Sequence, residues 1–246
     1  MKRVLLETKN VKHAQTMCKR MLSKKGEDLT LIYGRPGTGK SHFAKSVFAQ
    51  NGWGYYRIAT MDTARSFLRG IHRLLSFELY QSESISSNYT SELARQVIEM
   101  LQDLGRVRDR EGRQYVLVID EVNLAIQNSQ WKILEQIREF RDVALSKVIM
   151  IGEEDTKDRI KRYNNHFFSR CSNTVAFEIV SREEMQDIVV RTSEVSIDKD
   201  LLSWIIKKCD GNMHDLEGMI KDIEAIGKSL SVDKVGLNEM RSVVGA

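Results

Sequence analysis

Residues 34–41 carry glycines, a lysine and a hydroxyl side chain at spacings that suit phosphate binding. The segment GRPGTGKS satisfies the pattern G-x-x-x-x-G-K-[ST], in which glycines let successive backbone amides face a polyphosphate at the start of a helix. The pattern predicts that Lys40 contacts the β and γ phosphates and that the Ser41 hydroxyl ligates magnesium. The alternative is an ordinary glycine-rich turn before a helix. The predicted nucleotide-contacting residues of this segment are Gly34, Arg35, Pro36, Gly37, Thr38, Gly39, Lys40, Ser41 and His42.

Two adjacent carboxylates, Asp120 and Glu121, end the apolar run VLVIDE. An apolar run of this length is typical of a buried strand, and ligand sites in open α/β sheets lie where the strands end. Asp120 can hold magnesium through water, and Glu121 can orient and polarise an attacking water. The alternative is a strand that ends in two solvated acids, which the phosphate loop in the same chain disfavours. The residues therefore suit hydrolysis as well as binding.

Short apolar segments alternate with helical periodicity, which predicts an α/β fold with a five-stranded, mostly parallel sheet. We expect strands at Asp28–Tyr33, Tyr55–Ala59, Tyr115–Ile119, Lys147–Ile151 and Thr174–Ile179. We expect helices at Asn10–Ser23, Gly39–Gln50, Thr90–Leu104 and Asn128–Ala144, and another that Asp62 caps.

The strand signal disappears after residue 180, where Ser181 and Glu184 fit a capping box that opens a helix. Helices are expected at Ser181–Glu194, Lys199–Cys209 and Met213–Lys228, with a last segment at Lys234–Val244. We therefore divide the chain into a nucleotide-binding core with an N-terminal helix, residues 1–180, and a helical lid subdomain, residues 181–246.

The composition excludes several classes of protein. With 246 residues, 41% hydrophobic and 29% charged, and a single proline, the chain suits a helix-rich globular fold better than disorder or a fibre. No apolar stretch approaches the roughly 20 residues of a membrane span, and a charge precedes any apolar run at the N-terminus, so we expect a cytoplasmic protein without a signal peptide. The spacing of the three cysteines and five histidines fits neither a zinc site nor a disulfide framework. The net charge of +4 permits an anionic partner without requiring one.

The paired motifs GRPGTGKS (Walker A) and VLVIDE (Walker B), with a trailing helical segment, resemble an AAA+ ATPase over about residues 10–228. Within that family, the helix leading into the phosphate loop, the run Ile119–Asn123 and the stretch Ile149–Arg170 resemble the DNA-transposition ATPases of the MuB and TnsC type. The resemblance implies an AAA+ P-loop fold, ATP and Mg²⁺ as cofactors, and a homo-oligomeric ring or helical filament with ATP at subunit interfaces.

The resemblance also assigns roles to three further residues. Phe168-Ser169-Arg170-Cys171 resembles an arginine-finger segment, so Arg170 would reach the γ phosphate of a neighbouring subunit; the alternative is a solvated arginine before a strand. His214 stands where the family carries a sensor arginine in the lid, a departure that implies slow hydrolysis. Glu153 takes the place of the first sensor, where asparagine or threonine is commoner.

Arg65, Arg69 and Arg73 recur every four residues and form a basic ridge about 12 Å long on one predicted helix. In the resembling filaments this helix faces duplex DNA; the alternative is a solvated helix face. The mixed charges of Arg106–Arg113 favour an exposed loop, with DNA contact as the second interpretation. No base-reading motif is found, so contacts would be to phosphate and tolerant of sequence.

The sequence thus supports an ATP-dependent, DNA-binding AAA+ ATPase that assembles on double-stranded target DNA and recruits a transposase. Its slow hydrolysis would be stimulated by DNA or a partner. One alternative is a replication initiator or helicase loader. Another is a nucleotide-gated scaffold that binds no nucleic acid.

Overall fold

The computed structural model describes residues 8–128 and 130–244. They form a larger and a smaller compact unit. Of the described residues, the larger unit contains His13–Gly34 and Lys40–Ala176, and the smaller contains 8–12, Arg35–Gly39 and 177–244. The division expected between residues 180 and 181 stays a prediction. The N-terminal residues on which the signal-peptide expectation rests lie outside the described residues.

The larger unit is built on a five-stranded sheet in the order β2-β3-β4-β1-β5, which confirms the predicted α/β fold. The pairs β2–β3, β3–β4 and β4–β1 are parallel. The strands are β1 Asp28–Gly34, β2 Gly54–Arg57, β3 Val116–Asp120, β4 Lys147–Gly152 and β5 Cys171–Phe177. The strand expected at Tyr55–Ala59 therefore begins one residue earlier and ends at Arg57.

The central strands β3 and β4 are buried along their whole length, as their continuous apolar runs predict. Because β1, β3 and β4 are parallel, their carboxyl ends meet at one edge of the sheet. Gly34, Asp120 and Gly152 are the last residues of these strands. The start of the phosphate loop, the predicted catalytic carboxylates and Glu153 therefore share this edge.

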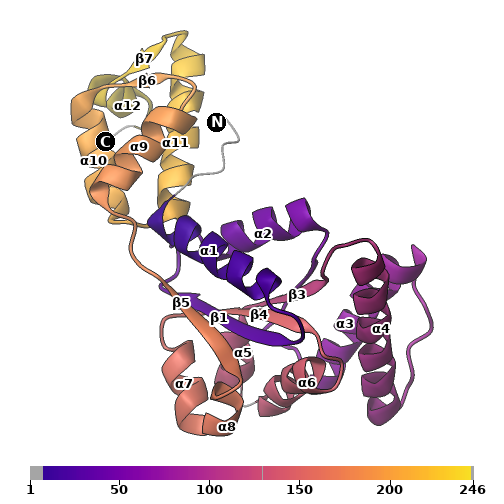
Figure 1. The fold of residues 1–246 in the computed structure, drawn as a ribbon. Helices are drawn as coiled ribbons and strands as arrows, with labels where there is room; N and C mark the ends of the chain where they lie inside the picture. Colours follow the sequence, from indigo (N-terminus) through magenta and orange to yellow (C-terminus); the bar gives the residue numbers. More distant parts are fainter. Residues whose placement is uncertain (1–7, 129, 245–246) are drawn as a thin grey trace. The chain divides into compact units, whose positions relative to one another are not determined.

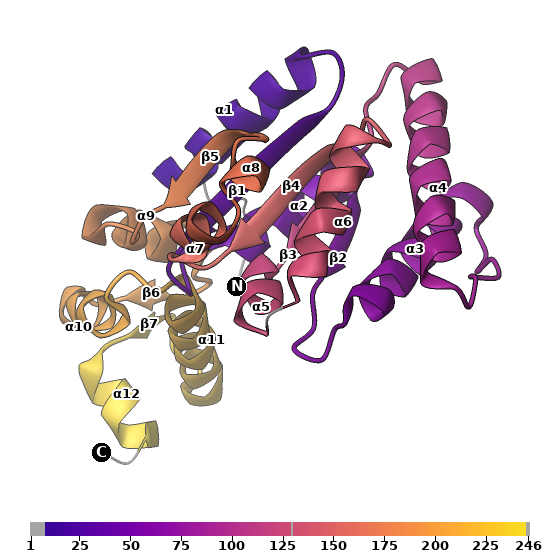
Figure 2. The same ribbon diagram turned by 90° about the horizontal axis from the view of Figure 1, so that it is seen from below.

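Helices cover both faces of this sheet. Figures 1 and 2 show α1, from His13 onward, and α2 on one face, and α5 to α8 on the other. The helices are α1 Lys9–Ser23, α2 Lys40–Asn51, α3 Ala64–Tyr80, α4 Thr90–Arg110, α5 Val122–Gln127, α6 Trp131–Asp142, α7 Thr156–Tyr163 and α8 Asn165–Phe168.

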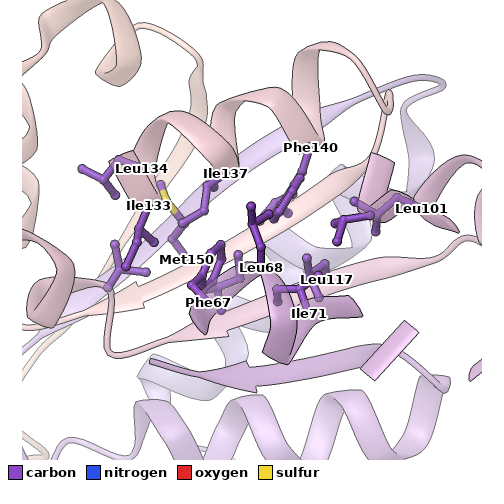
Figure 3. Close-up of a cluster of buried hydrophobic side chains, with 14 of the residues drawn as sticks. Phe67, Leu68, Ile71, Leu101, Leu117, Ile133, Leu134, Ile137, Phe140 and Met150 are labelled. Carbon is purple, nitrogen blue, oxygen red and sulfur yellow. The ribbon is translucent and has the colours of Figure 1, made fainter. Parts of the chain in front are cut away.

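The main core forms where α3, α4 and α6 meet the sheet (Figure 3). Phe67, Leu68 and Ile71 of α3 are fully buried because their spacing places them on one side of the helix. The ring of Phe67 stacks with Phe140 of α6 at 6.1 Å and meets the edge of Tyr56 at 5.4 Å. Such aromatic contacts fix how α3 packs beside β2.

Two expectations about helices need correction. The helix expected at Asn128–Ala144 is present as α6 but is shorter, and a separate short helix, α5, that was not expected directly follows β3. The charged segment that begins at Arg106 is helical up to Arg110, as the end of α4. Arg106 pairs with Asp103 one turn earlier at 2.9 Å, an interaction that supports a helix and not an open loop.

The cap expected at Asp62 is also displaced by one residue. Thr63 is the N-cap of α3 and forms a capping box with Ser66. The carboxylate of Asp62 instead accepts hydrogen bonds from the Tyr56 hydroxyl at 3.0 Å and from the Ala59 amide at 2.8 Å. Asp62 therefore fixes the turn before the helix.

Replacing Thr63 with alanine is expected to lower the free energy of unfolding by about 1 kcal/mol, because an amide of the first turn of α3 loses its acceptor. Urea unfolding followed by circular dichroism measures the change. Thr60→Ala is the control, since it removes an exposed hydroxyl outside any helix. An equal loss in both variants would contradict the capping role.

The smaller unit is mainly helical, as expected. Its helices are α9 Arg182–Thr192, α10 Lys199–Cys209, α11 Met213–Leu230 and α12 Leu237–Val244, with short parallel strands β6 Ser196–Ile197 and β7 Lys234–Val235. Buried apolar residues contributed by α9, α10 and α11 form most of its core. The predicted capping box of Ser181 and Glu184 at the start of α9 is confirmed. The two strands were not predicted because two residues are too few for a periodic pattern.

Within residues 8–128 and 130–244, no helix has the length and apolar character needed to cross a bilayer.

Candidate nucleotide site

The phosphate loop turns tightly between β1 and α2. Gly37 and Gly39 have φ angles of 78° and 90°, the left-handed region that glycine adopts without a steric penalty. Thr38 is buried, and its hydroxyl donates to the carbonyl of Arg35 at 2.8 Å. The glycines thus stand at positions where this turn requires them.

Lys40 begins α2 and is nearly buried. Its ammonium donates to the carbonyl of Gly34 at 2.8 Å. Burial lowers the pKa of Lys40, and the negative charges of Asp120, Glu121 and Glu153 act in the opposite direction. The structure therefore brings together Lys40 and the three carboxylates that the sequence places in the site.

Asp120 ends β3 and is 1% exposed. One of its carboxylate oxygens accepts the backbone amide of Glu121 at 2.9 Å, and the other accepts the Tyr55 hydroxyl at 2.6 Å. A carboxylate this deeply buried needs such donors, because desolvation would otherwise be costly. Both oxygens of the predicted magnesium ligand thus have a donor.

Glu121 has φ 60° and ψ 38°, a left-handed conformation that redirects the chain from β3 into α5. Its side chain is 25% exposed, and Oε1 accepts a hydrogen bond from Nη2 of Arg57 at 2.8 Å. The predicted catalytic carboxylate is therefore held by an arginine of the neighbouring strand β2.

The donor set at this sheet edge fits magnesium bound to a nucleotide. Mg²⁺ prefers oxygen ligands and keeps waters and substrate phosphates in its shell, so one or two protein ligands suffice. The hydroxyl of Ser41, in the first turn of α2, and the carboxylate of Asp120 are ligands of this kind. Glu153 directly follows β4, and its carboxylate accepts from the amide of Gln127 at 3.4 Å.

Within the smaller unit, the start of α11 contacts the phosphate loop. The amide of Met213 donates to the carbonyl of Gly37 at 2.7 Å. A Cβ atom on Gly37 would lie 2.1 Å from Oδ1 of Asn212, which leaves no room for a side chain. That same oxygen caps α11 by accepting the amide of His214 at 2.9 Å. The exposed His214 therefore stands one residue from a contact with the loop.

Arg170 lies elsewhere in the larger unit. It directly precedes β5, which runs in the same direction as β4 (Figure 2), and so lies at the edge where these strands begin, opposite the edge of Asp120. Its guanidinium donates to the carbonyl of His166 at 2.9 Å and pairs with Asp142 at 3.4 Å. The structure therefore does not pair Arg170 with Asp120, Glu121 or Glu153 of its own chain.

The three ridge arginines are exposed along α3, and each contacts the segment between α3 and α4. Arg65 donates to the carbonyl of Asn88 at 2.5 Å, and Arg69 to the side-chain oxygen of the same residue at 3.2 Å. Arg73 pairs with Glu83 at 3.6 Å. Arg65 and Arg69 thus have neutral partners, whereas an acid faces Arg73.

Two residues of this site were missed from sequence. Tyr55 and Arg57 lie two positions apart on β2 and so share one face of the strand. Their spacing in the sequence indicates that the two side chains lie on the same face of a strand. Whether they meet Asp120 and Glu121 depends on β2 lying beside β3. That strand order cannot be deduced from the sequence pattern.

Comparisons of the sequence with known proteins find a family and relatives. Residues 23–160 match the family described as "AAA domain". The Arabidopsis thaliana protein STICHEL-like 1 is 28% identical over 158 residues, which cover 61% of this chain but only 13% of that protein.

Solved structures share the fold. The Aeropyrum pernix ORC1 protein in complex with DNA has a TM-score of 0.72 and 14% identity, covering 99% of this chain and 66% of that one. Domain III of the Thermotoga maritima replication initiation protein DnaA has a TM-score of 0.62 and 15% identity, covering 98% and 93%. At such identities the likeness concerns the fold alone, which is that of AAA+ P-loop proteins. Because the family match extends over more than half of the sequence, the chain belongs to the AAA domain family.

Proposed function

We propose that the chain is an ATPase that binds ATP with Mg²⁺ and hydrolyses it to ADP and phosphate. The observation that carries this proposal is the placement of buried Lys40 at the phosphate loop, under the influence of Asp120, Glu121 and Glu153. Lys40 binds phosphate oxygens, and Ser41 and Asp120 hold the metal. Bound magnesium neutralises charge on the phosphates. Glu121 orients the attacking water and accepts its proton.

Arg170 would act on a neighbouring copy of the chain. Its position at the opposite sheet edge from Asp120 supports a role in trans, because it cannot serve a phosphate at its own site from there. ATP would then join adjacent subunits into a ring or helical filament. Glu153 would sense the γ phosphate, and His214 in place of a sensor arginine would keep hydrolysis slow.

We further propose that the assembly binds double-stranded DNA without sequence preference, in the cytoplasm. The exposed ridge of Arg65, Arg69 and Arg73 supports this, since guanidinium groups in a row can follow a phosphate backbone. The likeness in fold to an ORC1 protein solved with DNA is compatible with it. Electron microscopy with random duplex DNA should reveal assemblies with ATP and none without nucleotide.

Substituting alanine for both Arg65 and Arg69 is expected to weaken duplex binding roughly 10-fold or more, and to reduce the slope of log affinity against log salt by about 1 per arginine. A gel shift at several salt concentrations with ATP measures both quantities. ATP affinity should not change. The control is Arg191→Ala, which removes an exposed arginine paired with Asp187 on α9. If the double variant binds duplex DNA as tightly as the parent, the DNA-binding surface is not the ridge on α3.

The finer role we propose is target selection in DNA transposition, with recruitment of a transposase. It rests on the sequence resemblance around the Walker motifs. The second candidate is a replication initiator or helicase loader, which the fold likeness to ORC1 and DnaA favours. Binding of a purified transposase to the DNA-bound assembly would support the first role, and binding of a replicative helicase the second. If the protein causes no gel shift of duplex DNA, the remaining candidate is a nucleotide-gated scaffold that binds no nucleic acid.

A further inference from the structure

Tyr55 connects the phosphate-loop helix with the strand that carries the predicted metal ligand. Its hydroxyl donates to Oδ2 of Asp120 at 2.6 Å, across from β2 to β3. Its ring stacks on Phe48 of α2 with centroids 5.1 Å apart and planes 20° from parallel. The ring is therefore fixed by α2, while the hydroxyl is directed at a buried carboxylate.

The hydrogen bond from Tyr55 is of the strong kind. A hydroxyl to carboxylate distance of 2.6 Å falls in the range of charge-assisted hydrogen bonds. A phenol hydroxyl has an ordinary pKa of about 10 and is therefore a hydrogen-bond donor at neutral pH. Since the amide of Glu121 occupies the other oxygen, the carboxylate of Asp120 is held in one orientation.

We infer that Tyr55 is a positioning residue for magnesium, which orients Asp120 through its hydroxyl and so raises the affinity of the nucleotide site for the metal. The inference rests on the proposed ATPase function. Tyr55 is not itself a metal ligand in this proposal. Residues that orient a metal ligand typically change metal affinity by about 10- to 100-fold when they are removed.

The neighbouring tyrosine on β2 provides a matched control. Tyr56 also donates its hydroxyl to an aspartate, Asp62, at 3.0 Å, and its ring also contacts an aromatic residue, Phe67. Asp62 belongs to the turn before α3 and not to the nucleotide site. Substituting phenylalanine at either position removes one hydroxyl from the same strand and leaves the ring in place.

The experiment compares the 246-residue parent, Tyr55→Phe and Tyr56→Phe by the binding of a fluorescent ATP analogue, first in EDTA and then in a magnesium titration. We expect Tyr55→Phe to bind the metal-free nucleotide as the parent does, but to need about 10-fold more Mg²⁺ for half-maximal enhancement of binding. Tyr56→Phe should match the parent in both. Melting temperatures verify that all three proteins are folded.

Several outcomes would overturn the inference. If Tyr55→Phe needs no more Mg²⁺ than the parent, the hydroxyl does not position the metal ligand. If its binding falls equally in EDTA and in magnesium, or if Tyr56→Phe shows the same magnesium requirement, Tyr55 merely supports the fold. In all these cases the ATPase proposal survives, because the parent still binds nucleotide. A parent that binds no nucleotide would instead refute the proposed function itself.

Discussion

The Lys40→Ala protein is expected to lose nucleotide binding by at least about 100-fold. The variant removes the only ammonium group of the phosphate-loop motif, at a nearly buried position where loss of one partner of a charge pair typically costs about 2–5 kcal/mol. Isothermal titration calorimetry with ATP and Mg²⁺ measures the loss. Lys40→Arg should fail as well, because a planar guanidinium does not replace a compact ammonium.

Lys19→Ala is the matched control, since it removes an exposed lysine from α1 outside the candidate site. It should bind ATP as the parent does. If the Lys40→Ala protein is folded and retains parental affinity, the phosphates do not bind where we place them.

The Glu121→Gln protein is expected to bind ATP normally and to release phosphate at least about 100-fold more slowly than the parent. Glutamine keeps an oxygen that can accept the hydrogen bond of Arg57, so local structure should persist. It cannot accept a proton from water, and loss of such a general base typically costs about 10²- to 10⁴-fold. Single-turnover phosphate release measures the effect, and the ATP-bound assembly should accumulate.

Glu154→Gln provides the comparison, because it neutralises an exposed acid one position beyond Glu153. Its turnover should equal that of the parent. Parental phosphate release by the Glu121→Gln protein would remove the catalytic role from that carboxylate and leave the binding role of Lys40 intact.

Features that depend on neighbouring residues were predictable from the sequence. The phosphate loop is specified by its own glycines, and the central strands by continuous apolar runs, so the sheet edge that gathers Lys40, Asp120 and Glu153 follows from parallel topology. The capping box at Ser181 was recognisable because both of its members lie within one turn.

Features that depend on distant residues were not predictable. Arg57 reaches Glu121 and Tyr55 reaches Asp120 only because β2 pairs with β3, although more than sixty residues separate the partners. Likewise, the partners of Arg65 and Arg69 lie in a connecting segment whose conformation no periodic pattern indicates. The end of α4 was misjudged because its charges suggested an open loop, whereas pairs such as Arg106 with Asp103 stabilise the helix.

The left-handed backbone at Glu121 implies a compromise between the stability of the fold and the proposed catalytic role of the side chain. A residue with a Cβ atom adopts this conformation at a cost of about 1 kcal/mol or more, which glycine would avoid. Selection for thermal endurance alone would therefore favour replacing the glutamate, while selection for turnover would retain it. Variants of position 121 that unfold at a higher temperature than the parent should therefore, under the proposed ATPase function, no longer hydrolyse ATP.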